Sequence, residues 1–165
     1  MTPEFSRPFA VDRLALSGLE QAVVADAQEC RALAVRLGVP AVLALSCRFR
    51  LTPGAARTVL AEGRLEARVV RECVLTLDEF ETAVAEVFRV RFVPEEALQE
   101  DDDPDSEDQI ALTGGLVDLG EAAAEQLALA LDPYPRKPGS PGPEEEPGAA
   151  PSAFAALARL RRPDD

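Results

Sequence analysis

The chain contains no histidine and no tryptophan, and aromatic residues make up only 5% of its 165 positions. Without histidine it cannot form the Ser-His or Cys-His pairs of nucleophilic enzymes, and it lacks the commonest general base at neutral pH. Glycine-rich phosphate loops of the Walker and dinucleotide-binding types are also absent. The Gly-Gly pair in residues 113–115 is interpreted as a turn. These absences argue against an enzyme.

Long apolar segments are missing as well. The longest uncharged apolar run, residues 38–46, is far shorter than the roughly 20 residues that a membrane-spanning helix needs. The first 14 residues lack the basic and apolar stretches of a signal peptide. Cys30, Cys47 and Cys73 form no C-x-x-C motif, which favours a reducing compartment and a packing role for each thiol. We therefore expect a soluble cytoplasmic protein with no membrane contact.

Basic residues are absent from one long stretch. Residues 92–135 contain no Lys or Arg but hold 13 of the 30 acidic residues. The other 17 acids are matched by 17 Lys and Arg, so the net charge of −13 belongs to this stretch. Such a segment repels nucleic acid and anionic membrane and attracts basic partners.

The densest part of this stretch is the run EDDDPDSED at 100–108. Its acidic side chains are Glu100, Asp101, Asp102, Asp103, Asp105, Glu107 and Asp108. A calcium loop starting at Asp101 would need glycine where Ser106 stands and glutamate where Leu112 stands. A magnesium-dependent nuclease would need carboxylates on rigid elements, whereas consecutive acids beside Pro104 are typical of a solvated loop. Two interpretations stay open: a plain charged loop, or a surface that binds a basic partner. We expect no metal and no cofactor.

Alternating hydrophobicity predicts strands over residues 45–51, 63–80 and 80–94, after an opening strand over 8–17. Helices are predicted over 25–40, where Asp26 caps the start and Gly38 the end, and over 116–133. In the second helix, Asp118 and Glu121 have the spacing of a capping box.

These elements predict one α+β domain over residues 1–132, in which a curled antiparallel sheet, open or barrel-like, is packed by two helices. It includes an acidic loop at 95–108. A Pro/Gly-rich linker is predicted over 133–151, and a short amphipathic helix over 152–162.

The polar faces of the predicted strands carry six arginines, namely Arg48, Arg50, Arg64, Arg68, Arg89 and Arg91. If the strands are neighbours, these side chains form a patch able to contact phosphates. Glu66, Glu72 and Glu81 interleave with them, so the alternative is cross-strand ion pairing. Aromatic positions for stacking single-stranded bases are lacking.

Several segments resemble the YceD family of large ribosomal RNA subunit accumulation proteins, and the resemblance is greatest to its alphaproteobacterial branch. They are GRLEARVVRECVLTLDEFETAVAEVFRVRFVPE, the acidic run, GGLVDLGEAAAEQLALALDPYPRKPG and SAFAALARLRR, which together span residues 63–161. Many members of the family carry a C-x-R-C pair where this chain has Val70 to Cys73. Because the first thiol is replaced by valine, Cys73 is interpreted as a packing residue of a strand.

The resemblance implies a non-enzymatic role in assembling the large ribosomal subunit. It also implies a basic ribosomal protein as client, such as a small zinc-ribbon protein of that subunit. Two hypotheses follow. The acidic segment binds the basic client, or the arginine face binds ribosomal RNA directly; a metal-dependent nuclease is the least favoured reading.

Overall fold

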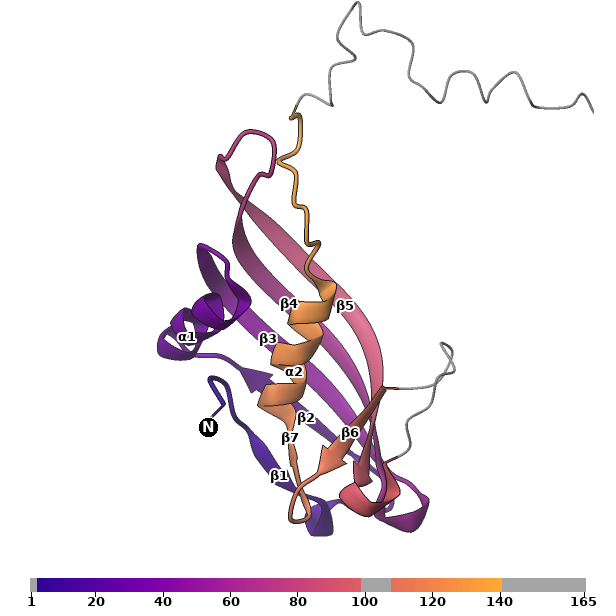
Figure 1. The fold of residues 1–165 in the computed structure, drawn as a ribbon. Coiled ribbons are helices and arrows are strands. Elements are labelled where there is room, and N and C mark those ends of the chain that lie inside the picture. Colours follow the sequence, from indigo (N-terminus) through magenta and orange to yellow (C-terminus); the bar gives the residue numbers. More distant parts are fainter. Residues whose placement is uncertain (1–2, 99–107, 141–165) are drawn as a thin grey trace, which may run out of the picture.

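A computed structural model describes residues 3–98 and 108–140 of the chain. Its main layer is a curled five-stranded sheet with the strand order β2-β3-β4-β5-β6 (Figure 1). The strands are β2 (Leu19–Val24), β3 (Ala41–Pro53), β4 (Val59–Glu72), β5 (Glu79–Pro94) and β6 (Asp108–Leu112). A second, two-stranded sheet pairs β1 (Pro8–Ala10) with β7 (Leu116–Asp118). The described elements confirm the predicted α+β class, and the sheet is open rather than closed into a barrel.

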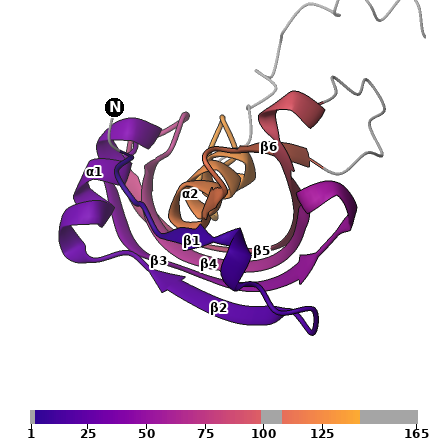
Figure 2. The same ribbon diagram turned by 90° about the horizontal axis from the view of Figure 1, so that it is seen from below.

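Two α-helices complete the fold. Helix α2 (Leu119–Ala130) lies in the hollow of the curled sheet, and α1 (Ala27–Leu37) packs beside β3 (Figure 2). Single 3₁₀ turns follow β1, β3 and β5; they are η1 (Val11–Arg13), η2 (Ala55–Arg57) and η3 (Glu95–Ala97). None of the described helices is long and apolar enough to cross a membrane.

The predicted alternation sets the two faces of the sheet. On β3, Leu45, Cys47, Phe49 and Leu51 are buried against the helices, because successive side chains of a strand point to opposite faces. We call this side the inner face and the side away from α2 the outer face. All three cysteines are free and buried, as expected.

Helix α1 begins and ends where the sequence predicts. The Asp26 carboxylate accepts hydrogen bonds from the N–H groups of Gln28 and Glu29, both at 2.8 Å, and Glu29 accepts one in return from the Asp26 N–H. Gly38 ends the helix in the left-handed conformation, with φ of 63°.

The start of α2 differs from the prediction in two respects: Leu116–Asp118 of the predicted helix form strand β7, and the capping box is incomplete. Asp118 accepts from the N–H groups of Gly120 and Glu121 at 3.0 and 3.1 Å. Glu121 does not complete the capping box, because its carboxylate binds Arg36 at 2.6 Å instead.

Three expectations about the strands are wrong. The sheet is not wholly antiparallel, because β6 pairs with β5 in the parallel direction. The predicted strand over 63–80 stops at Glu72, where the chain turns; Leu77 has a positive φ of 60° and is 70% exposed. Of the predicted opening strand only Pro8–Ala10 forms, and it belongs to the small sheet. Strand β2 was not predicted.

Candidate nucleic-acid interface

The six predicted arginines all lie on the outer face, on three adjacent strands. Arg48 and Arg50 stand on β3, Arg64 and Arg68 on β4, and Arg89 and Arg91 on β5; all six are exposed. Because β3, β4 and β5 are neighbours in the sheet, the condition for a common patch is met. The described helices and the small sheet lie on the inner side, so none of them covers this face (Figure 2).

The register of the strands orders these side chains in rows. One row runs Glu20, Arg50, Glu62, Arg89, so its charges alternate. The next outer row runs Ala22, Arg48, Arg64, Val87, so its two arginines are direct cross-strand neighbours with small or apolar residues on either side. Directly opposed like charges destabilise a sheet. The Arg48–Arg64 pair therefore costs stability unless an anion lies against it.

Within the described residues, Arg68 and Arg89 form ion pairs with outer-face glutamates, and Arg91 is not without a partner either. Arg68 Nε lies 2.6 Å from Glu81 Oε1, and Arg89 Nη2 lies 2.9 Å from Glu62 Oε1. The hydrogen bond from Arg68 lowers the pKa of the Glu81 carboxyl, which keeps it charged. All four side chains are about half exposed, so these pairs contribute little to stability. Cross-strand pairing thus accounts for part of the patch.

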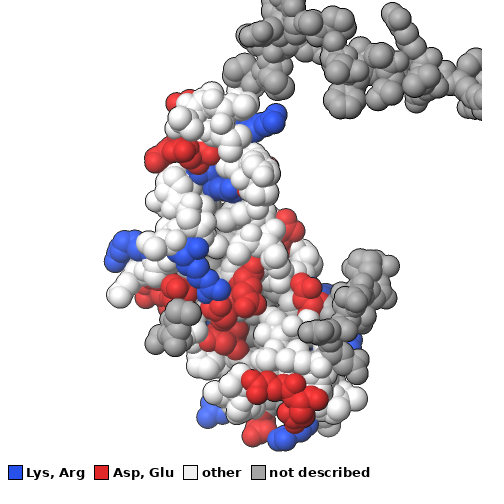
Figure 3. Space-filling view, viewed as in Figure 1, with Lys and Arg blue, Asp and Glu red and all other residues white. Residues whose placement is uncertain are grey.

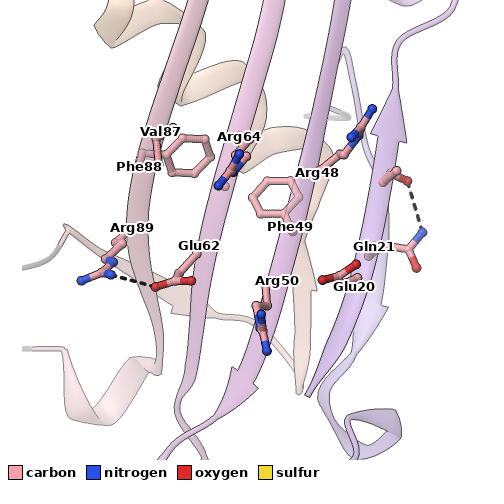
Figure 4. A pocket seen from close by; sticks show the side chains of 12 residues that line it. Glu20, Gln21, Arg48, Phe49, Arg50, Glu62, Arg64, Val87, Phe88 and Arg89 are labelled. Atoms are coloured by element: carbon pink, nitrogen blue, oxygen red, sulfur yellow. Dashed lines mark hydrogen bonds and ion pairs between the residues drawn. The ribbon is translucent and has the colours of Figure 1, made fainter. Parts of the chain in front are cut away.

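The remaining charge is concentrated on Arg48, Arg50 and Arg64. Within residues 3–98 and 108–140, none of these three guanidinium groups has an ion pair or a hydrogen bond to another side chain. They project around a shallow hollow of about 610 Å³ (Figure 4). The two outer rows form its sides, and the backbone of the row between them, Gln21, Phe49, Gly63 and Phe88, forms its floor.

Gly63 shapes this region from the inner side. A Cβ at this position would lie 2.2 Å from the ring of Phe88, so only glycine lets that ring cross β4. The Phe88 ring packs edge-on against Phe49, with centroids 5.8 Å apart and planes at 80°. The contact between Gly63 and Phe88 was not predicted from the sequence, although a glycine inside an alternating strand is a known sign of such close packing.

The acidic run falls mostly outside the described residues. Glu100, Asp101, Asp102, Asp103, Asp105 and Glu107 lie in the undescribed segment 99–107. Asp108 is exposed and begins β6, where it is the register partner of Val90 on β5. Val90 stands between Arg89 and Arg91, so the C-terminal end of the run is fixed beside the arginines of β5.

The α2 side of the molecule has a different charge pattern from the outer face. Acidic side chains gather near the middle of this side and at its lower end (Figure 3). Some are neutralised: Glu29 binds Arg7 at 2.6 Å, and Glu121 and Glu4 both bind Arg36. Nowhere in the described part of the chain do three or more Asp, Glu, Cys or His side chains form a group able to hold a metal ion.

A second polar cluster lies where segment 131–140 docks on the β4–β5 turn. Arg71, buried on the inner face, donates to the carbonyl of Asp132, and the Val74 N–H donates to that of Pro135 at 3.0 Å. Cys73 lies 3.4 Å from the Ser140 hydroxyl. Hydrogen bonds, foremost that from the Lys137 N–H, lower the pKa of the Cys73 thiol to about 6 and outweigh the opposing effect of burial. Arg71 stands on the otherwise apolar face of β4, and the sequence gave no sign of this docking.

Comparison with known families gave one result. A sequence model described as large ribosomal RNA subunit accumulation protein YceD matches residues 61–161, more than half of the chain. This range includes all but the first two residues of β4, the whole of β5 and the acidic run, but not the arginines of β3. Comparisons with curated proteins and with solved structures gave no match.

Proposed function

Because the chain belongs to the YceD family of large ribosomal RNA subunit accumulation proteins, we propose that it supports large-subunit assembly by holding the ribosomal RNA backbone on its outer face. Arg48, Arg50 and Arg64 are the proposed contacts. The role is one of binding, without a catalysed reaction, and we place it in the cytoplasm, where free thiols are kept reduced.

The observation that carries this proposal is the Arg48–Arg64 row. The two residues are cross-strand neighbours, exposed and without an acidic partner among the described residues. In an antiparallel pair such neighbours have Cβ atoms roughly 5 Å apart. Two guanidinium groups at that separation reach the same phosphate or two adjacent ones, and a phosphate removes their mutual repulsion.

The chemistry of the face indicates what kind of RNA contact it makes. The outer-face side chains flanking Arg48 and Arg64 are Ala22 and Val87, and the next row holds Val24, Ser46, Glu66 and Ala85. None of these can stack on a base, and base stacking is how single-stranded RNA modules read sequence. We therefore propose backbone and shape recognition with little sequence preference.

The test is the affinity of the full chain for a large-subunit ribosomal RNA fragment, measured by fluorescence anisotropy at low salt. We expect R48Q/R64Q to bind at least tenfold more weakly, because two charge-assisted phosphate contacts of about 1 kcal/mol each are removed. R13Q/R31Q is the matched control: it removes the same charge from exposed arginines outside the outer face. No measurable RNA affinity of the native chain would end this proposal.

A second candidate function is favoured by the charge distribution. The 13 acids of residues 92–135 have no base among them, and Glu95, Glu96 and Asp108, on either side of segment 99–107, are exposed. This arrangement supports binding of a basic ribosomal protein, with a small zinc-ribbon protein of the large subunit as the proposed client. An acidic surface would shield that client from other RNA and steer its encounter.

The two candidates are separated by a pulldown from lysate with and without nuclease. Partners lost on nuclease treatment reach the protein through RNA, and a basic protein that remains is a direct client. Replacing the seven acids of 100–108 by Asn and Gln should then weaken client binding and its salt dependence. Unchanged client affinity in that variant would rule out the acidic segment as the binding surface.

A further inference from the structure

The edge of β5 that faces away from β4 is the longest unpaired strand edge in the described structure. β6 pairs with β5 only from Val90 onward, so Glu79–Arg89 has β4 on one side and no described strand on the other (Figure 1). Apart from β4, no described segment makes a backbone hydrogen bond to this stretch. An unpaired edge presents a row of N–H and C=O groups able to pair with another strand.

The usual protections against strand addition are weak here. Residues 79–89 contain no proline and no glycine, and the β4–β5 register runs without a bulge. The stretch has a strand composition, with Phe80, Val84, Val87 and Phe88 among its residues. Edges that must stay unpaired are normally short, twisted by bulges, interrupted by proline or lined with charged side chains. Of these features this edge has only the charges, and they are of both signs.

The edge is complementary to itself. We propose that a second copy of this chain adds its own β5 antiparallel to this edge, centred on Val84, to form a two-fold symmetric dimer with a continuous sheet. The cross-copy pairs are then Glu79 with Arg89, Phe80 with Phe88, Glu81 with Val87, Thr82 with Glu86, Ala83 with Ala85, and Val84 with Val84. Opposite charges meet at both ends, and aromatic rings meet in two places; both kinds of cross-strand pair are stabilising.

About ten backbone N–H and C=O groups on each copy would gain a hydrogen-bond partner, since the two residues of each hydrogen-bonded pair in an antiparallel ladder exchange two bonds. The inner side of the edge also offers space. A hollow of about 310 Å³ is lined by Phe80, Thr82 and Val84 of β5, by the end of α2 and by Arg136. Arg71 and Arg136 line this hollow together with the same copy's Glu86 and Asp132, and Glu86 of the second copy, opposite Thr82, would enter beside the two arginines.

The dimer has a consequence for the outer face. A two-fold axis perpendicular to the paired edges keeps the outer faces of both copies on the same side. The Arg48–Arg64 rows of the two copies would then belong to one surface that spans the junction. A longer segment of RNA backbone would be contacted than one copy allows. Dimerisation itself is independent of the proposed function and is tested without RNA.

The test is the oligomeric state of the full chain, measured by sedimentation equilibrium. We expect a monomer–dimer equilibrium in the micromolar range for the native chain. E79R places two arginines opposite each other at both ends of the edge and should weaken the dimer roughly tenfold. R89E should do the same with two glutamates, and E79R/R89E should restore the native dimer. E66R, the same charge change on exposed β4, is the matched control and should leave the dimer unchanged.

Hydrogen exchange locates the interface. The N–H groups of Glu79–Arg89 that point away from β4 should exchange more slowly as the protein concentration rises. E79R should remove this effect. A chain that stays monomeric at millimolar concentration would overturn the proposal. So would a dimer that E79R does not weaken, or amides protected equally at every concentration.

Discussion

Gly63 is the residue on which the packing beneath the proposed RNA surface depends most closely. Its missing Cβ gives room for the Phe88 ring, which packs in turn on Phe49. We expect Gly63→Ala to lower the free energy of unfolding by about 1–3 kcal/mol, because the new methyl group forces Phe88 from its site. Chemical denaturation measures this directly.

The control for this prediction is a double-mutant cycle. Phe88→Leu removes the ring that the new methyl group would meet, so G63A/F88L should lose less stability than the sum of the two single variants. If the stability losses of the two single variants are additive, the Phe88 ring does not restrict the side chain at position 63.

Cys73 makes stability depend on pH in a range where few groups titrate. Its folded pKa is about 6, whereas an unfolded thiol titrates near 8.5. For an acid whose pKa is lowered on folding, the stabilisation is complete above the unfolded value and is lost as the pH falls to the folded one. The free energy of unfolding of the native chain should therefore increase relative to that of Cys73→Ala as the pH rises from about 6 to about 9.

Thermal melts of both proteins across this range test the prediction. Any effect of pH on the rest of the molecule is shared by the two proteins and cancels in the difference between their Tm values. A difference that is constant from pH 6 to pH 9 would show that the Cys73 thiol has the same pKa in the folded and the unfolded chain.

At the scale of an element, α1 depends on Glu29 in two ways. The carboxylate completes the capping box with Asp26 and binds Arg7 through both oxygens, at 2.6 and 2.9 Å. We expect Glu29→Gln to cost about 1–2 kcal/mol of stability, with Glu96→Gln, an exposed acid on η3, as the neutral control.

The pH dependence of this loss has a defined sign. The hydrogen bond from Arg7 lowers the pKa of Glu29 below its ordinary value of about 4.5. Its contribution is therefore present above that value and lost as the pH falls further. The native chain and Glu29→Gln should converge in stability in acid; a gap that persists at low pH would mean that charge is not what Glu29 contributes.

The elements differ in how far the sequence predicts them. α1 was predictable at both ends because Asp26 and Gly38 act locally, and the faces of β3 and β4 followed from alternation. The parallel direction of β6 was not predictable, since it depends on the crossover between β5 and β6. β2 is a six-residue strand with only Val23 buried, so its pattern is too weak to detect. The turn after Glu72 was not predicted, because Leu75 and Leu77 continue the hydrophobic alternation of the strand.

At the scale of the whole molecule, the acidic excess belongs to residues 92–135, whereas arginines and glutamates share the outer face. The arginines could be assigned to one face from the sequence, but which of them are neutralised depends on register. That register places Arg89 opposite Glu62 and Arg48 opposite Arg64. The strand residues alone do not say which arginine stands opposite a glutamate, so the Arg48–Arg64 row emerged only from the structure.

The acidic run should act on RNA binding through the charge of the whole molecule. Replacing its seven acids by amides changes the net charge from −13 to −6. We expect RNA affinity to rise roughly threefold to tenfold at low salt, because repulsion falls and because the run ends beside Arg89 and Arg91. The gain should vanish at about 1 M salt, where screening acts within roughly 3 Å. RNA affinity that falls on neutralisation would contradict this.

The proposed RNA contact is tested most directly by the salt dependence of RNA affinity. For native chain, R48Q/R64Q and the control R13Q/R31Q, the logarithm of the association constant is plotted against the logarithm of salt concentration. Each lost phosphate contact should reduce the slope by about one unit, so R48Q/R64Q should be shallower by about one unit if the two arginines share a phosphate and by about two units if they contact adjacent ones. The control should follow the native line. If all three slopes are equal, Arg48 and Arg64 do not contact the RNA backbone.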